Sequence, residues 1–317
     1  MTGNAGKDHS SAAMIALLGG HLREWAPELV PDWMPSADFL DNGRVDIDAK
    51  RRLIRHVMDH DGAGLLISVG ESMHHIQHLP IADVLLMSRD TDNLAMKWQR
   101  LERYVHSRHQ TRIELAGSRR WHCTHVSITD SRPEAGEDLL VCGLIIGVLR
   151  EFGCLDIRVR MDGQDWAAED LKSFALPGET AVWSIYWQDR QAPEGRDCAL
   201  VGKLGETRLA VGEAAPCARY IAEDLGAPQN IATTARDLGR STRTLQRELS
   251  RSGFTFSSLT RGIRVEAATG LLTESDMSLA GIGFICGFSD QAHFQRDFKR
   301  VMGMTPGQYR DNLVNVD

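Results

Sequence analysis

Apolar positions recur with a helical period through the C-terminal third of the chain, and one arrangement of them occurs twice. The two copies span residues 231–247 and 279–296. In each copy an apolar stretch ends at a glycine, Gly239 or Gly287, and a polar turn leads into a second stretch that carries Gln and Arg. Glycine suits the left-handed backbone conformation that ends a helix. The pattern therefore predicts two helix–turn–helix units, an arrangement that reads DNA when its second helix enters the major groove.

The same periodicity predicts that the whole C-terminal domain is helical. Its seven expected helices span residues 217–225, 231–238, 241–252, 257–273, 278–286, 290–302 and 305–312. Ser241 and Ser289 stand where a side chain is needed to cap the following helix, and Pro306 lies near the first turn of the last one. The two glycines of the repeated pattern mark where the preceding helices end.

In the N-terminal part, helical and strand-like patterns alternate. Helices are predicted over residues 11–25, 48–58, 92–105 and 137–152, and the segments 65–72 and 81–88 favour helix but are short enough to form strands. Asp92 is the candidate N-cap of the third helix. Alternating positions predict strands at 112–116 and 121–128, paired as a hairpin, and further strands at 155–160 and 180–187. We therefore expect an α/β (or α+β) domain.

A segment with little periodicity separates the two parts. Residues 194–215 are rich in glycine, proline and charge, although 207–211 is compatible with a short strand. Domain boundaries fall where few core contacts form. We expect residues 1–205 to form one domain, residues 206–216 to form a linker, and residues 217–317 to form the helical domain with its two helix–turn–helix units.

Charge is divided unevenly between these parts. The 317-residue chain has a net charge of −7. Residues 216–317 contain 12 Lys and Arg against 11 Asp and Glu, which leaves 24 against 32 for residues 1–215. Four arginines of the helical domain recur at three- or four-residue spacing, which places them along one side of a helix. They are Arg240, Arg243, Arg247 and Arg251. A domain of balanced charge binds a polyanion when its basic groups share one face.

The sequence around the second copy is specific enough to indicate a family. A connecting stretch, Arg264-Val-Glu-Ala-Ala-Thr-Gly-Leu-Leu, is followed by Gly287-Phe-Ser-Asp-Gln-Ala-His-Phe-Gln-Arg and by Gly303-Met-Thr-Pro-Gly-Gln-Tyr-Arg. Residues 217–312 thereby resemble the AraC/XylS family of transcriptional regulators. The resemblance implies a bacterial activator that binds double-stranded promoter DNA and contacts RNA polymerase. It also implies that one chain places two recognition helices in successive major grooves, roughly 34 Å apart.

The resemblance further implies which side chains meet the DNA. The expected contacts of the first recognition helix are Ser241, Thr242, Arg243, Gln246 and Arg247. Those of the second are Gln291, Ala292, His293, Gln295 and Arg296. Arg and Gln read guanine and adenine through paired hydrogen bonds, whereas Ser and Thr hydroxyls suit phosphates. Ala292 offers only an apolar contact, and for His293 and Gln295 a phosphate contact or simple exposure is as compatible as a base contact.

The opposite faces of the two recognition helices are expected to lie in the core. The residues concerned are Leu245, Leu249, Phe294 and Phe298. Segment 305–309 is interpreted as structural, with Tyr309 packed against the second unit. Gly281 and Gly283 depart from the family's usual residues inside the first helix of that unit, and each costs roughly 1 kcal/mol relative to Ala. They predict that the second reader is looser than the first.

A second resemblance concerns the N-terminal part. Residues 45–62 and 64–72 look like the effector-binding and dimerisation domain of the ornithine-utilisation type of AraC regulator. This implies a homodimer with a small organic effector, and an α/β sensor rather than a cupin barrel, which would begin with short strands. Five aromatic residues suit either pocket walls or the core, so the effector-binding residues stay unassigned. They are Trp98, Trp121, Trp183, Tyr186 and Trp187.

Catalytic and metal chemistry have little support in the sequence. The chain has no Cys-x-x-Cys pair, no Gly-x-Ser-x-Gly and no His-Glu-x-x-His, so neither an enzyme nor a cofactor is expected. His74 and His78 stand one helical turn apart, and His122 and His125 lie near Cys123 on a predicted strand. Because the spacing fixes no third ligand, no metal site is expected.

Two further expectations concern the thiols and the location of the protein. Redox or alkylation sensing through Cys142 or Cys123 stays as the alternative function, against the simpler interpretation of buried cysteines. The longest apolar run, residues 139–149, is shorter than the roughly 20 residues that cross a bilayer. The first residues lack a basic stretch followed by an apolar one. We expect a cytoplasmic protein without membrane contact.

Overall fold

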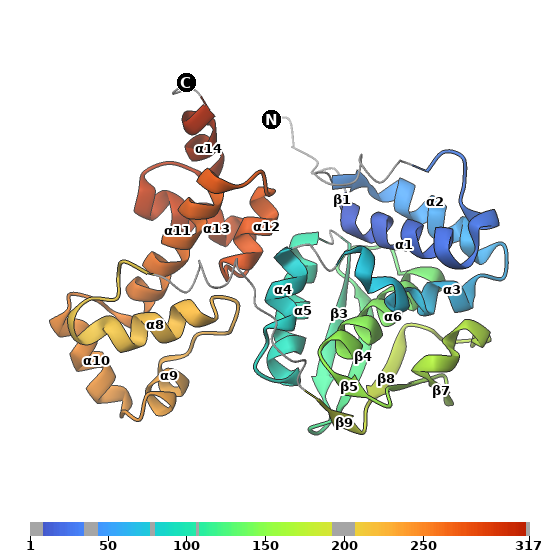
Figure 1. The fold of residues 1–317 in the computed structure, drawn as a ribbon, viewed down its shortest axis with the longest axis horizontal. Helices are drawn as coiled ribbons and strands as arrows, with labels where there is room; N and C mark the ends of the chain where they lie inside the picture. Colours follow the sequence, from blue (N-terminus) through green and yellow to red (C-terminus); the bar gives the residue numbers. More distant parts are fainter. Residues whose placement is uncertain (1–8, 35–43, 77–79, 106–107, 192–206, 315–317) are drawn as a thin grey trace. The chain divides into compact units, whose positions relative to one another are not determined.

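The chain folds into two compact units, Met1–Gly195 and Arg196–Asp317 (Figure 1). This computed structural model describes residues 9–34, 44–76, 80–105, 108–191 and 207–314. The first unit combines helices with an antiparallel sheet, and the described part of the second is helical. The expected fold classes of the two parts are therefore confirmed.

A five-stranded sheet organises the N-terminal unit. Its strands, in spatial order, are β3 (His109–Leu115), β4 (Arg120–Ser127), β8 (Val182–Tyr186), β6 (Arg158–Met161) and β7 (Gln164–Ala167). All neighbouring strands in it are antiparallel. Alternate residues of β4 are buried, so Trp121, Cys123 and His125 face the core. The predicted hairpin and the strand at β8 are confirmed, whereas the sequence pattern missed β7.

Among the described residues, two short strand pairs lie outside this sheet. β1 (His9–Ser11) pairs with β2 (Arg44–Asp46), and β5 (Cys154–Leu155) pairs with β9 (Asp189–Arg190). The strand predicted at 155–160 is thus divided between β5 and β6. Asp156 lies between them with φ +51°, a left-handed conformation that interrupts an extended strand.

Helices make up most of the remaining N-terminal unit. They are α1 (Ala12–Trp25), η1 (Pro27–Leu29), α2 (Ile47–Met58), α3 (Ala63–Ile67), η3 (Val69–His75), α4 (Pro80–Leu86), α5 (Thr91–Val105), α6 (Ala135–Glu151) and η4 (Ala168–Ser173). The apolar segments at 65–72 and 81–88 are accordingly helical. The predicted N-cap at Asp92 is wrong, because Asp90 accepts the hydrogen bond from Asn93 N at 2.7 Å.

Helix α6 packs closely against its neighbours. It is buried from Gly136 to Leu149. A Cβ atom added at Gly143 would lie 2.4 Å from the carbonyl oxygen of Ile67, and one at Gly147 would lie 2.6 Å from the Cα atom of Gly70. These two glycines therefore allow the backbone of α6 to approach that of α3 and η3.

The C-terminal unit contains every helix that the sequence predicts. Its helices are η5 (Gly212–Ala214), α8 (Ala215–Glu223), α9 (Ile231–Asp237), α10 (Thr242–Arg251), α11 (Phe256–Glu274), α12 (Leu279–Ile285), α13 (Gln291–Met302) and α14 (Pro306–Val314). Residues 207–211 form a turn rather than the short strand considered above. The Thr207 hydroxyl and the Arg208 N–H both donate to the carboxylate of Glu266 on α11, at 2.6 and 3.0 Å.

Candidate nucleic-acid interface

The first helix–turn–helix unit consists of α9 and α10. Asn230 caps α9 by accepting a hydrogen bond from Ala232 N at 2.8 Å, and Ser241 caps α10 by accepting one from Thr244 N at 3.1 Å. Gly239, between the helices, has φ +67°, as predicted for the residue that ends α9. Local sequence therefore determines both the turn and the start of α10.

Helix α10 has one buried face and one exposed face. Leu245 and Leu249 are each 1% exposed and lie in the core, as predicted. Arg243, Gln246 and Arg247 are exposed on the other side, and Thr242 is half-buried. The three exposed side chains are long and polar, which suits them for hydrogen bonds to base edges. Helix α10 thus exposes a polar face, while its apolar face is fixed in the core.

The row of four arginines predicted from the sequence is divided by acidic partners. Arg240 pairs with Glu248 at 3.2 Å, and Arg251 pairs with Glu213 at 3.3 Å. Within the described residues, Arg243 and Arg247 have no hydrogen-bond or ion-pair partner. The ion pairs therefore leave these two central arginines as the side chains of the row that can bind phosphate or guanine without first breaking a salt bridge.

The second helix–turn–helix unit consists of α12 and α13. Gly287 ends α12 with φ +81°. The N-cap of α13 is Asp290, which accepts from His293 N at 2.7 Å, so the predicted cap at Ser289 is wrong. Ser289 donates its hydroxyl proton to Asp290 at 2.9 Å and thereby supports the cap. A carboxylate suits this position because it lies at the positive end of the helix dipole.

Helix α13 also has two faces. Phe294 and Phe298 are fully buried, as predicted, and Ala292, Gln295 and Arg296 are exposed. The ring centroids of Phe294 and Phe298 are 5.7 Å apart, and the chain of rings continues from Phe298 to Tyr309 at 5.6 Å. Tyr309 therefore packs against the second unit, as expected from the sequence.

His293 is bound within the domain by both ring nitrogens. Its Nδ1 atom accepts a hydrogen bond from Ser289 N at 3.2 Å, so Nε2 carries the proton that is donated to Asp297 at 2.9 Å. Asp297 also forms an ion pair with Arg261 of α11 at 3.2 Å. These contacts orient α13 relative to the turn and to α11. The sequence analysis missed this role, although Ser289 and Asp297 are each four residues from His293 and only Arg261 lies on another helix.

Helix α11 separates the two readers, with α9 and α10 near one end and α12 and α13 near the other (Figure 1). Its 19 residues span about 28 Å. Near the C-terminal end of α11, Arg310 of α14 donates hydrogen bonds to the carbonyl oxygens of Met277 and Ser275, at 2.7 and 3.3 Å. The end of the sequence signature therefore stabilises the joint between α11 and α12.

Most of the aromatic residues considered as walls of an effector pocket lie in the core of the N-terminal unit. Trp98, Trp121, Trp183 and Trp187 are all buried, which favours the core interpretation over exposed pocket walls. Tyr186 is half-buried and hydrogen-bonds to Asp165. Effector-binding residues therefore stay unassigned.

The cysteines considered for thiol sensing lie in the core. Cys123 and Cys142 are fully buried, and burial raises the pKa of both thiols well above the usual range. A neutral thiol shielded from solvent reacts poorly with oxidants and alkylating agents. The arrangement therefore disfavours the alternative function through these two residues.

The histidines considered as metal ligands separate into two groups. His122 lies 3.2 Å from the Ser184 hydroxyl, and His125 lies 2.7 Å from the Asp138 carboxylate, so neither shares a site with Cys123. His78 lies outside the described residues. His74, however, lies beside His75 and Glu24, a group that the sequence did not indicate.

Comparison with known proteins supports the assignment of the C-terminal unit. A family model described as a helix-turn-helix domain matches residues 234–312. Probable transcription factor PqrA of Proteus vulgaris is 39% identical over 88 residues, which cover 27% of this chain and 72% of PqrA. The urease operon transcriptional activator of Escherichia coli is 40% identical over 76 residues, 24% of this chain and 26% of that protein. The ornithine utilization regulator of Pseudomonas aeruginosa is 33% identical over 82 residues, 26% of this chain and 24% of that protein.

Two exposed recognition helices and these matches define a DNA-binding transcription regulator with a double helix–turn–helix domain. The chain belongs to the AraC/XylS family, which consists of regulators rather than enzymes. The matched stretch spans about a quarter of the ornithine and urease regulators, and it lies in the C-terminal helix–turn–helix region. The predicted likeness of the N-terminal part to the ornithine type therefore gains no support from this match. In the described ranges, no helix is both long and apolar enough to cross a membrane.

Proposed function

We propose that this regulator reads promoter DNA mainly through α10, with α13 as a second reader, and activates transcription in response to a small organic effector. The observation that carries the proposal is the exposed group of Arg243, Gln246 and Arg247, which lies on a helix anchored by Leu245 and Leu249. The two arginines suit guanine or phosphate, and Gln246 suits adenine. Thr242 contacts a phosphate, while Ser241 combines any such contact with its role as helix cap.

The second reader has fewer side chains with which to specify a sequence. Gln295 and Arg296 are exposed and supply its polar contacts, and Ala292 supplies an apolar one. Gln291 is the first residue of α13, and its proposed contact is with the backbone of the DNA. His293 acts indirectly, because its ring nitrogens already bind Ser289 and Asp297. The second unit therefore contributes more to position than to base selection.

The length of α11 supports binding in successive major grooves. About 28 Å of helix, together with the flanking turns, is close to the roughly 34 Å between neighbouring major grooves on one side of DNA. Bending of the DNA can make up the remaining difference in length, since a moderate bend costs only a few kcal/mol.

The N-terminal unit is the proposed effector-binding and dimerisation domain, covering residues 1–205. Its support is that Met1–Gly195 forms a compact unit with its own sheet and core. A ligand that binds one conformation of this unit more tightly would shift the population of the operator-binding state. Two chains of the homodimer would then contact RNA polymerase at the promoter, in the cytoplasm of a bacterial cell.

The DNA assignment is tested by selecting binding sites from random double-stranded DNA with the full chain. In gel-shift titrations on the enriched site, Arg247→Ala should weaken binding by roughly 1 to 3 kcal/mol without a change in melting temperature. Arg219→Ala removes an exposed charge from α8 and serves as the matched control, with a much smaller loss. Unchanged affinity in Arg247→Ala, or equal losses in both variants, contradicts the placement.

The effector assignment is tested by thermal-shift screening of metabolites against the full chain. A ligand at 100 times its dissociation constant stabilises the state that binds it by about 2.7 kcal/mol. We expect a hit to shift the unfolding of the N-terminal unit and to change affinity for the selected DNA. An N-terminal unit that neither binds a metabolite nor dimerises would contradict the sensor role.

A further inference from the structure

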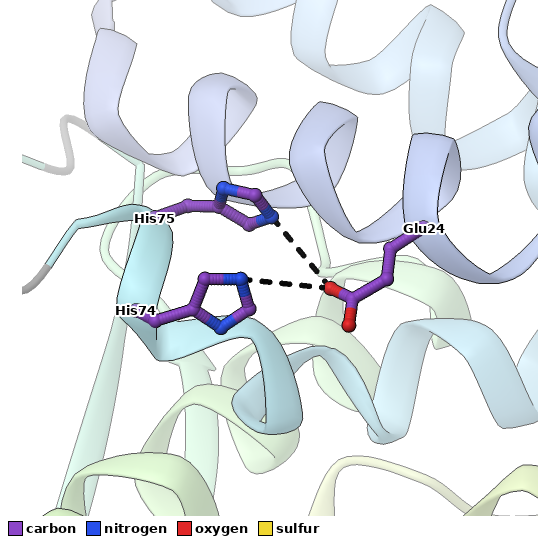
Figure 2. A group of neighbouring side chains, drawn as sticks. All are labelled: Glu24, His74 and His75. Carbon is purple, nitrogen blue, oxygen red and sulfur yellow. Dashed lines mark ion pairs between the residues drawn. The ribbon is translucent and has the colours of Figure 1, made fainter.

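Glu24 of α1 and the neighbouring residues His74 and His75 of η3 bring three metal-ligating side chains together on the N-terminal unit. Figure 2 shows both imidazole rings directed at the carboxylate, and the Nε2 atom of each ring lies 3.7 Å from Glu24 Oε2. One ligand atom from each of the three residues lies within 4.8 Å of the other two. We propose that these residues bind one divalent transition-metal ion of the zinc class.

The separations are close to those of a bound ion. Zinc lies about 2.0–2.2 Å from imidazole nitrogen and carboxylate oxygen, so two ligands of a tetrahedral ion are roughly 3.4 Å apart. The two nitrogen–oxygen distances of 3.7 Å exceed this value only slightly. All three side chains are exposed to solvent. Small torsional adjustments therefore close the site around an ion.

A buried chain of hydrogen bonds orients the carboxylate. Ser72 donates its hydroxyl proton to Glu24 Oε2 at 3.0 Å, and its oxygen lies 2.8 Å from Nδ1 of His21. Because Ser72 has one proton, His21 must donate from Nδ1. The Ser68 hydroxyl lies 3.3 Å from the other nitrogen of His21. Ligating carboxylates are characteristically held by hydrogen bonds of this kind, which fix the ligand in position before the ion arrives.

The backbone of α1 also makes room for one of the imidazoles. A Cβ atom added at Gly20 would lie 2.5 Å from Cδ2 of the His75 ring. Gly20 precedes Glu24 by one helical turn, so both positions lie on the same face of α1. This face thus receives the His75 ring at Gly20 and supplies the carboxylate one turn later.

The donor set determines the class of ion. Two imidazole nitrogens and one carboxylate oxygen suit zinc and its neighbours among the divalent transition metals, whereas magnesium and calcium prefer oxygen ligands throughout. Three protein ligands leave a fourth tetrahedral position for water or for a donor atom of a small molecule. The site is therefore suited to a reversibly bound ion rather than to a closed structural one.

The test is a zinc titration of the full chain, purified with chelator and without a histidine tag, in competition with a chromophoric chelator. We expect one equivalent of zinc to bind, and His74→Ala/His75→Ala and Glu24→Gln each to weaken binding by at least about tenfold. Magnesium should not compete. Cobalt in place of zinc should give the absorption bands of a four-coordinate ion, and these should be lost in the double variant.

The control is His56→Ala/His60→Ala, which removes another pair of neighbouring histidines with ring centroids 4.7 Å apart. It should bind zinc as the unmodified chain does. Gly20→Ala provides a second route, because its methyl group displaces the His75 ring while leaving all three ligands present. It should also weaken binding, with melting curves confirming the fold. Zinc binding that is absent, or unchanged in the His74→Ala/His75→Ala variant, overturns the proposal.

Discussion

The two helix–turn–helix units share a plan but are anchored to different degrees. In the first unit, α9 buries Thr234 and Ala235, and its other residues lie nearer the surface. In the second, α12 is buried at every position from Gly281 to Ile285, and aromatic rings continue the packing through α13. Intrinsic helix propensity predicts a looser second unit from its two glycines, whereas the burial of α12 favours a more tightly packed one. The more deeply buried unit is thus the one for which we propose fewer base-reading side chains.

The turns of the two units should respond very differently to a methyl group. Gly287→Ala would place Cβ 1.8 Å from the carbonyl oxygen of Leu225, whereas at Gly239 nothing lies within 4 Å of the added atom. Both residues are left-handed, which costs roughly 1–2 kcal/mol for alanine. We therefore expect a loss of at least about 3 kcal/mol for Gly287→Ala and about 1 kcal/mol for Gly239→Ala in denaturant unfolding. Equal losses would show that the second turn is no more tightly packed than the first.

The ion pair between α11 and α13 should matter next most. Asp297→Ala leaves Arg261 and His293 without their shared partner, and we expect the second unit to lose about 1–2 kcal/mol of stability. Asp297→Asn keeps an acceptor for His293 and should lose less. In DNA binding, Asp297→Ala should affect mainly the half of the site read by α13. A loss spread evenly over the site would contradict a positioning role for Asp297.

In the first unit, removal of an acidic partner should strengthen DNA binding rather than weaken it. Glu248→Gln releases Arg240, which the carboxylate holds at 3.2 Å in the unmodified chain. One additional arginine near the phosphates should raise affinity for DNA of any sequence by up to about 1 kcal/mol and steepen the dependence of log affinity on log salt by about 1. Salt titrations of the selected site and of an unrelated duplex measure both effects. A slope that does not change would place Arg240 away from the DNA.

The smallest effect is expected at one of the glycines that suggested a loose second unit. In Gly281→Ala the new Cβ would lie 3.3 Å from the capping hydroxyl of Ser278 and 3.6 Å from Met277. This slight crowding offsets the gain in helix propensity of roughly 1 kcal/mol. The melting temperature should therefore change little. A large stabilisation would mean that helix propensity, rather than packing, limits the stability of the second unit.

Local patterns predicted most of the C-terminal unit. The caps and turns at Ser241, Gly239, Gly287 and Pro306 depend on neighbours in the sequence, and the core faces of α10 and α13 follow from the helical period. Non-local partners were not predictable in this way. Nothing in the spacing indicated that Asp297 would meet Arg261, or that acidic residues would pair with Arg240 and Arg251.

The N-terminal unit illustrates the same limit. Its helices and its hairpin follow from local periodicity, whereas β7 and the division of the strand at 155–160 do not. The cluster of Glu24 with His74 and His75 joins segments about fifty residues apart, so only the folded chain brings it together. A cluster of side chains from distant segments could therefore be recognised only in the structure.

Missing-base interference on the selected site, with the full chain, identifies the bases on which α10 and α13 depend. Within each half-site bound by one chain, two clusters of required bases should lie about one helical turn, 10–10.5 base pairs, apart on one face of the DNA. Arg247→Ala should remove the dependence on one cluster, and Arg296→Ala should weaken the dependence on the other. A single cluster, or two variants that affect the same bases, would contradict the placement of α10 and α13 in successive grooves.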